Sequence, residues 1–234
     1  MGKAPLPKPR LTARVGVTGH RPERLVGADA ETLRREIRAV LAAAAAKLSA
    51  LRSQDAARGA SAFSAEPPLL RVVSSLAEGA DRLVAREARA LLPEGVDVEL
   101  VCPLPFAREE YARDFSPDGR REFEALLAGS FVFELDGSRE GGKADEAYEA
   151  AGRAMLDTSD ILIAVWDGQG ARGRGGTGQI VAEAARRGRP VVWVHVGGGK
   201  AHAACLLAWS DGPACGAMPD ISSLLDGLLK PPAS

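Results

Sequence analysis

The chain has 234 residues, of which 46% are hydrophobic and 26% are charged, and its formal net charge is −1. This length and composition are typical of a soluble globular protein, and they fit one large α/β domain better than two small ones. The near-zero charge provides no overall basic field for nucleic acid or an anionic membrane, and no apolar run reaches the roughly 20 residues of a membrane helix.

The N-terminus and the cysteines predict the location of the protein. The opening stretch MGKAPLPKPRLTA lacks the apolar core that a signal peptide needs. The three cysteines, Cys102, Cys205 and Cys215, form no CxxC pair, and their odd, sparse number fits a reducing compartment. We therefore expect three free thiols and a cytoplasmic protein.

Short apolar runs predict the strands. We expect a flexible tail over residues 1–12 and a single domain over residues 13–234. The runs are rich in Val, Ile and Leu and do not alternate with polar residues, which is typical of strands covered on both faces. They lie at residues 14–19, 69–76, 96–105, 130–135, 160–167 and 190–196.

Helical patterns lie between these strands. Apolar residues at helical spacing predict helices over 29–52, capped by Asp29, over 79–92 and over 178–188, and residues 106–128 form a charged, helical excursion. The alternation predicts a Rossmann-like, doubly wound α/β fold with a mainly parallel sheet and helices on both faces. Strands 14–19 and 160–167 should be adjacent at its centre, whereas the pattern decays after residue 197.

In such a sheet, ligands bind beyond the carboxyl ends of the strands, so the loops that follow the strands are informative. The first loop contains Thr18, Gly19, His20 and Arg21. Gly19 allows backbone to approach a ligand, Thr18 offers a hydroxyl, and Arg21 can bind a phosphate or carboxylate through two hydrogen bonds. The alternative is a simple turn with a solvated arginine.

The second loop, SSLAEGAD, precedes the helix predicted over 79–92. Gly79 breaks the chain there, so amides near Asp81 could face an anion at a positive helix end, with Ser75 nearby. Asp81 could instead cap that helix. Glu78 would point at the strand ends, either as a ligand to ribose hydroxyls or as a solvated charge.

The third loop is rich in glycine and follows the most apolar strand. Six glycines fall within residues 168–178, directly before a predicted helix, and such a run exposes amides beside which a phosphate fits. It is neither a Walker A loop nor a dinucleotide fingerprint in its usual place. The alternative for this loop is a flexible surface loop. Asp167, at the end of the strand before it, could accept hydrogen bonds from a ribose or could simply cap the loop. The expected ligand-binding residues here are Asp167, Gly175, Gly176, Thr177 and Gly178.

Three stretches together resemble a known family. VGVTGHRP is similar to the first-strand signature of YspA/YpsA-like proteins, VVSSLAEGADRLVAREA to the DprA-type SGLAxGIDxxAH stretch, and GGTGQIVAEA to the LOG-type GGxGTxxE motif. On these residues, which span about 14–196, the chain resembles the YspA/YpsA-like branch of the Smf/DprA–LOG (SLOG) superfamily. The resemblance implies a Rossmann-like domain with a nucleotide-sized pocket and a glycine-rich phosphate cradle.

The chain departs from the family at the catalytic position. LOG enzymes cleave the base from a nucleoside monophosphate, and the glutamate of GGxGTxxE is catalytic in them. Counted from Gly175, Gln179 stands at the threonine position and Ala182 at the glutamate position. Glu183 follows one step later, about 100° around the helix.

The leading hypothesis is a protein that binds or senses a phosphorylated nucleotide or nucleotide-derived ligand, including ADP-ribose-like molecules. An alternative is an enzyme that hydrolyses an N-glycosidic bond in such a ligand, where Glu78 or Glu183 would stabilise the oxocarbenium ion. A third hypothesis is DprA-like binding of single-stranded nucleic acid, although no basic stripe with interleaved aromatics is present. We expect no metal site, no cofactor besides the ligand and no membrane partner, and we leave a homodimer open.

Overall fold

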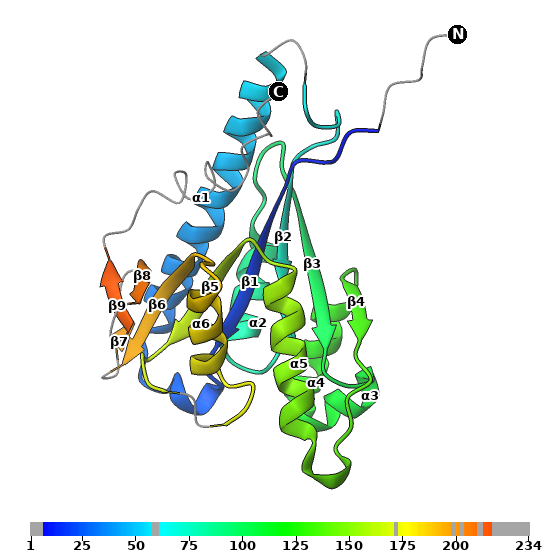
Figure 1. Ribbon diagram of the computed structural model, residues 1–234, viewed down its shortest axis with the longest axis vertical. Helices are drawn as coiled ribbons and strands as arrows, with labels where there is room; N and C mark the ends of the chain where they lie inside the picture. The colour runs from blue at the N-terminus through cyan, green and yellow to red at the C-terminus, as the bar shows by residue number, and fades with distance from the viewer. Residues whose placement is uncertain are drawn as a thin grey trace.

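The strands of this protein form one mixed sheet. The computed structural model describes residues 7–57, 61–170, 173–197, 200–201, 204–209 and 213–216. The strand order is β4-β3-β2-β1-β5-β6-β8-β9, and β7 pairs with β6 (Figure 1). The strands are β1 (Thr12–Gly19), β2 (Leu69–Val73), β3 (Asp97–Leu104), β4 (Phe131–Glu134), β5 (Ile161–Trp166), β6 (Val191–Gly197), β7 (Lys200–Ala201), β8 (Cys205–Trp209) and β9 (Pro213–Gly216).

The sheet confirms the predicted fold class. Strands β1 to β6 correspond to the six predicted apolar runs and pair in parallel, and β1 and β5 are neighbours near the centre. Strands β7, β8 and β9 add antiparallel pairs at one edge, where the sequence analysis predicted no strand. The result is a Rossmann-like, doubly wound α/β fold.

Helices connect the strands on both faces. The helices are α1 (Ala30–Ala57), α2 (Ala80–Ala90), α3 (Arg108–Tyr111), α4 (Pro117–Leu127), α5 (Ala144–Asp157) and α6 (Thr177–Arg186). Asp29 caps α1 as expected, because its carboxylate accepts the N–H of Glu31 (3.1 Å) and the hydroxyl of Thr32. The sequence analysis did not predict α5.

The core lies in two layers, one on each face of the sheet. Helices α1, α2 and α4 pack on one face, and α5 and α6 pack on the other (Figure 1). Strand β5 contributes to both layers because successive side chains of a strand point to opposite faces. Its residues Ile161, Ile163 and Val165 face the first layer, and Leu162, Ala164 and Trp166 face the second.

The predicted tail is anchored at its end. Leu11 is buried, and the Arg10 side chain donates to the carbonyl of Pro67 (2.6 Å), so these residues belong to the fold. Residues 1–6 of the predicted tail lie outside the described residues. Among the described helices, none is long and apolar enough to cross a membrane.

The expectation of three free thiols is wrong. Cys205 and Cys215 form a disulfide, and Cys102 is free and buried. The reason is the unpredicted hairpin of β8 and β9, which brings the two cysteines to a Cα–Cα distance of 5.7 Å, within the usual range for disulfides.

The cysteine pairing predicts the number of reactive thiols. Unfolding the protein without a reductant should expose the thiol of Cys102 alone to a maleimide reagent, whereas unfolding after reduction should expose those of Cys205 and Cys215 as well. Mass spectrometry of the labelled chain counts the adducts. Three adducts on freshly purified, unreduced protein would contradict the disulfide.

Candidate ligand-binding cavity

A cavity of about 450 Å³ opens at the carboxyl ends of the central strands. It lies where the loop after β1, the loop after β2 and the start of α6 come together, which is the usual ligand position in a doubly wound sheet. Ten residues predicted from the sequence line it: Thr18, Gly19, His20, Arg21, Ser75, Asp81, Gly175, Gly176, Thr177 and Gly178.

The end of β1 needs a glycine because α2 and the neighbouring strand β5 both approach it closely. A Cβ at Gly19 would lie 2.4 Å from the Cβ of Ala80 and 2.8 Å from the carbonyl oxygen of Val165. The backbone of His20 then joins both elements, since its N–H donates to Val165 and its carbonyl accepts the N–H of Ala80, each at 3.0 Å. The first amide of α2 is therefore used within the fold and does not face an anion.

His20 and Asp167 form a polar link between β1 and β5. The buried His20 places Nε2 3.0 Å from the Asp167 carboxylate, which also pairs with Arg24 and accepts the N–H of Gln169. Burial alone would raise the pKa of Asp167, but these donors hold it below its ordinary value. Asp167 does not line the cavity and instead positions His20 and Arg24, both of which do.

Arg21 brings a cation to the cavity that has no close partner. Among the described residues, none forms a side-chain hydrogen bond or ion pair with its guanidinium, which is half-buried in the cavity lining. Its charge nevertheless acts on two neighbours: burial raises the pKa of both Asp81 and Tyr111, and the charge of Arg21 opposes that rise. A half-buried, unpaired guanidinium is available to an anionic ligand.

Asp81 is a buried carboxyl in the same cavity. Burial raises its pKa to about 6, against the opposing effects of Arg21, the Ser74 hydroxyl (3.3 Å) and the N–H of Ala77. The side chain thus bonds to the loop before α2 and does not cap the helix, where no side-chain cap is present at Gly79. A carboxyl of this kind can carry a proton near neutral pH.

The glycine-rich loop is fastened to α5 before it reaches the cavity. Gly175 has φ +74°, and a Cβ there would lie 2.7 Å from the backbone nitrogen of Glu149. Its N–H donates to the Gln179 side chain (2.8 Å), which in turn donates to the Glu149 carboxylate (2.9 Å). Gln179, the residue at the family's threonine position, therefore holds the loop in place, and the amide of Gly175 is not available to a ligand.

Two amides at the start of α6 remain open. Within the described parts of the chain, the N–H groups of Thr177 and Gly178 find no acceptor, and both residues line the cavity. The first amides of a helix carry partial positive charge, so they attract an anion. Arg174 contributes less, because Glu146 and Glu149 accept its hydrogen bonds at 2.8 and 2.9 Å.

The two proposed catalytic carboxylates lie outside the cavity lining, as does Gly79. Glu78 lies 3.6 Å from Arg82 and 3.5 Å from the Ser116 hydroxyl, towards the start of α4. Glu183 is buried on another side of α6, where it pairs with Arg153 (3.3 Å) and Arg187. The cavity thus does not bring together the carboxylates that the sequence singled out.

Tyrosines that the sequence analysis did not assign complete the cavity. Tyr111 is 1% exposed, lines the cavity, and its hydroxyl makes no hydrogen bond with any described residue. Tyr148 also lines it, with its hydroxyl bonded to Asp114. The only sequence signal was the position of Tyr111 in the excursion that follows β3, and α5, which carries Tyr148, was not predicted.

Comparison of the chain with models of known protein families found no match, and a search of curated proteins found none. The residues of the cavity are therefore the guide to its chemistry. They combine an unpaired cation, open helix amides and a buried carboxyl, which is a set suited to a ligand with an anionic group and hydroxyls.

Asp81 predicts how stability depends on pH. Its pKa is higher in the folded state, about 6, than the ordinary 3.8, so its ionisation destabilises the folded protein as pH rises through this interval. Asp81→Asn, which mimics the protonated group, should gain up to about 3 kcal/mol of unfolding free energy over wild type between pH 4 and pH 7. Urea unfolding at both pH values measures this gain.

The exposed carboxylate of Asp118 in α4 provides the control for this experiment. Asp118→Asn should show no comparable gain over the same interval, because this group is solvated. Parallel pH profiles for Asp81→Asn and wild type would contradict the raised pKa of Asp81.

Proposed function

We propose that the protein binds or senses a phosphorylated nucleotide or nucleotide-derived ligand, ADP-ribose-like molecules included, and that it is a YspA/YpsA-like member of the SLOG superfamily. The observation that carries the proposal is the unpaired guanidinium of Arg21 in the same cavity as the open amides of Thr177 and Gly178. Both groups favour negative charge, and together they suit a phosphate better than a neutral group.

The remainder of the cavity suits the sugar and base of such a ligand. Its volume of about 450 Å³ lies within the range of small-molecule sites. The unbonded hydroxyl of Tyr111 and the carboxyl of Asp81 offer donors and acceptors to ribose hydroxyls. Met155 and Ile180 provide apolar surface in the lining.

Hydrolysis of an N-glycosidic bond is the second candidate, and one observation favours it. Asp81 is a carboxyl with a pKa of about 6 in the cavity lining, so it could act as an acid on a bound ligand. Glu78 and Glu183 lie outside this lining. Release of free base from adenosine 5′-monophosphate (AMP), followed by chromatography, would support this activity. Saturable binding of unchanged AMP supports the binding role.

Binding of single-stranded nucleic acid would show an affinity that rises with oligonucleotide length and falls steeply with salt. A cytoplasmic location is still our prediction, as is a partnership with a small-molecule ligand and no further cofactor. Native mass spectrometry of the freshly purified protein would reveal both a retained ligand and a homodimer.

Arg21 predicts discrimination between phosphorylated and unphosphorylated ligands. Arg21→Ala should weaken AMP binding about ten- to hundredfold and leave adenosine binding nearly unchanged, because a charge-assisted hydrogen bond contributes about 1.5–3 kcal/mol. Isothermal titration calorimetry measures both affinities. Arg120→Ala, which removes an exposed arginine of α4 outside the cavity, is the matched control. An equal loss for both ligands would remove Arg21 from the phosphate site.

The start of α6 predicts a backbone contact that proline can test. Thr177 is the first residue of α6, where proline is favoured, and Gly176 before it has φ −70° and ψ 157°, which proline tolerates in its predecessor. Thr177→Pro should therefore fold with a nearly unchanged melting temperature but lose AMP affinity by about tenfold or more, because it removes the N–H.

Thr177→Ala separates the amide from the hydroxyl. It removes the same hydroxyl but keeps the N–H, so its loss of AMP affinity should be clearly smaller than that of Thr177→Pro. If the two variants bind AMP equally well, the N–H of Thr177 is not a ligand donor.

A further inference from the structure

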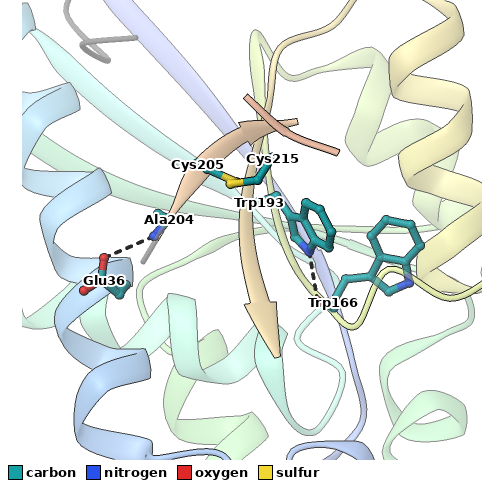
Figure 2. Close-up of a disulfide and its surroundings, with 6 residues drawn as sticks. All are labelled: Glu36, Trp166, Trp193, Ala204, Cys205 and Cys215. Carbon is teal, nitrogen blue, oxygen red and sulfur yellow. Dashed lines mark hydrogen bonds between the residues drawn. A yellow bond between two sulfur atoms is a disulfide. The ribbon is translucent and has the colours of Figure 1, made fainter. Parts of the chain in front are cut away.

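The disulfide lies next to β6, the neighbour of the strand β5 that the glycine-rich loop follows. Cys205 in β8 is the register partner of Trp193 in β6, and Cys215 ties β9 to β8 at the edge of the sheet (Figure 2). Trp193 and Cys205 are both buried in the core layer that α5 and α6 cover. The pair of sulfur atoms is thus part of the packing on this face.

Two tryptophans connect this edge to the start of the loop. The indole N–H of Trp193 donates to the carbonyl of Trp166 (2.9 Å), as Figure 2 shows, and the two rings lie 5.6 Å apart. The indole N–H of Trp166 in turn donates to the carbonyl of Gln169 (2.9 Å), in the glycine-rich loop. Trp166 also lines the ligand cavity.

The hairpin of β8 and β9 also approaches the loop directly. A Cβ at Gly168, where φ is +81°, would lie 3.2 Å from Cζ2 of Trp193 and 3.9 Å from Cγ of Pro213 in β9. The first turn of the loop therefore packs against both β6 and the hairpin that the disulfide closes. Displacement of the hairpin removes one wall of this turn.

The core layer itself continues from the disulfide to the cavity. The same buried cluster contains Cys205, Trp193 and Trp166 and also Met155 and Ile180, and the last three of these line the cavity. A rearrangement at Cys205 can therefore reach the cavity through side chains in contact, without a change in the central strands.

We propose that the Cys205–Cys215 disulfide is a redox switch that regulates the ligand cavity, with the oxidised form as the binding-competent one. This inference rests on the proposed function. A dithiol reductant breaks the bond between the two cysteine sulfurs: each sulfur gains one electron and one proton, and the dithiol closes to its own disulfide.

The exposure of the pair suits this role. Cys215 is exposed and so accessible to a thiol, whereas Cys205 is 4% exposed and transmits the change inward. Among the described residues, the hairpin has few other restraints. The ladder of β8 to β6 has two register pairs, and the N–H of Ala204 donates to Glu36 of α1 (3.2 Å, Figure 2). Disulfides that occur in a reducing cytosol are usually transient, catalytic or redox-sensing, which agrees with the proposed location.

The test compares oxidised and dithiothreitol-reduced protein by two measurements. Hydrogen exchange followed by mass spectrometry should show faster exchange in peptides that contain Gly168 and Gln169 after reduction, with peptides of β1 unchanged. Calorimetry should show AMP affinity weakened by about fivefold or more, in the usual range of coupling between sites.

Two cysteine variants control for the reductant. Cys215→Ser, at an exposed position, should behave like reduced wild type with or without dithiothreitol. Cys102→Ala keeps the disulfide and should respond to dithiothreitol as wild type does. A response of Cys215→Ser to the reductant would show that the effect arises elsewhere and would overturn the proposal.

The outcomes separate this inference from the proposed function. If AMP and ADP-ribose bind neither form, the proposed function fails, and the hydrogen exchange alone decides whether the disulfide controls the loop. If exchange at Gly168 is the same in both forms, the coupling is wrong. If exchange changes but AMP affinity does not, the disulfide does not regulate the ligand cavity.

Discussion

The architecture of the cavity depends on the close crossing of α2 over the end of β1. Gly19 leaves no room for a side chain between Ala80 and Val165, and His20 bonds by its backbone to both α2 and β5. This contact brings Asp81 of α2 and Arg21 of the loop after β1 into the lining of one cavity. A larger residue at position 19 would separate the two elements that hold the cation and the carboxyl together.

The two helix N-termini near the cavity differ in what their first amides can bind. The first amide of α2 is occupied by the carbonyl of His20, whereas those of Thr177 and Gly178 in α6 find no acceptor among the described residues. The difference lies in what precedes each helix. A tight glycine crossing places a carbonyl before α2, and a loop held by Gln179 and Glu149 leaves the start of α6 open.

The sequence predicted the parts of this protein whose signal is local. The six parallel strands were recognisable because buried strands are continuous apolar runs, and ten predicted residues do line one cavity because strand ends converge. Helix α5 was not predicted because Ala147, Glu149 and Ala151 form the buried face of its first turns, and the large apolar residues Met155 and Leu156 enter that face only near its C-terminus. The positions of Glu78 and Glu183 depend in part on contacts with Ser116 and Arg153, which lie far from them in the sequence. The disulfide depends on a hairpin that was not predicted, so no local pattern revealed any of these features.

The position of Asp81 beside Arg21 has a consequence for the heat of any binding reaction. Arg21 favours the ionised form of this carboxyl, whose pKa is about 6. A phosphate bound at Arg21 would offset that cation and add negative charge nearby, so the bound state would retain a proton more strongly than the free state. Binding would then take up protons from the solution around pH 6 and above. The observed enthalpy would depend on the ionisation heat of the buffer, and the number of protons taken up could be obtained from that dependence alone.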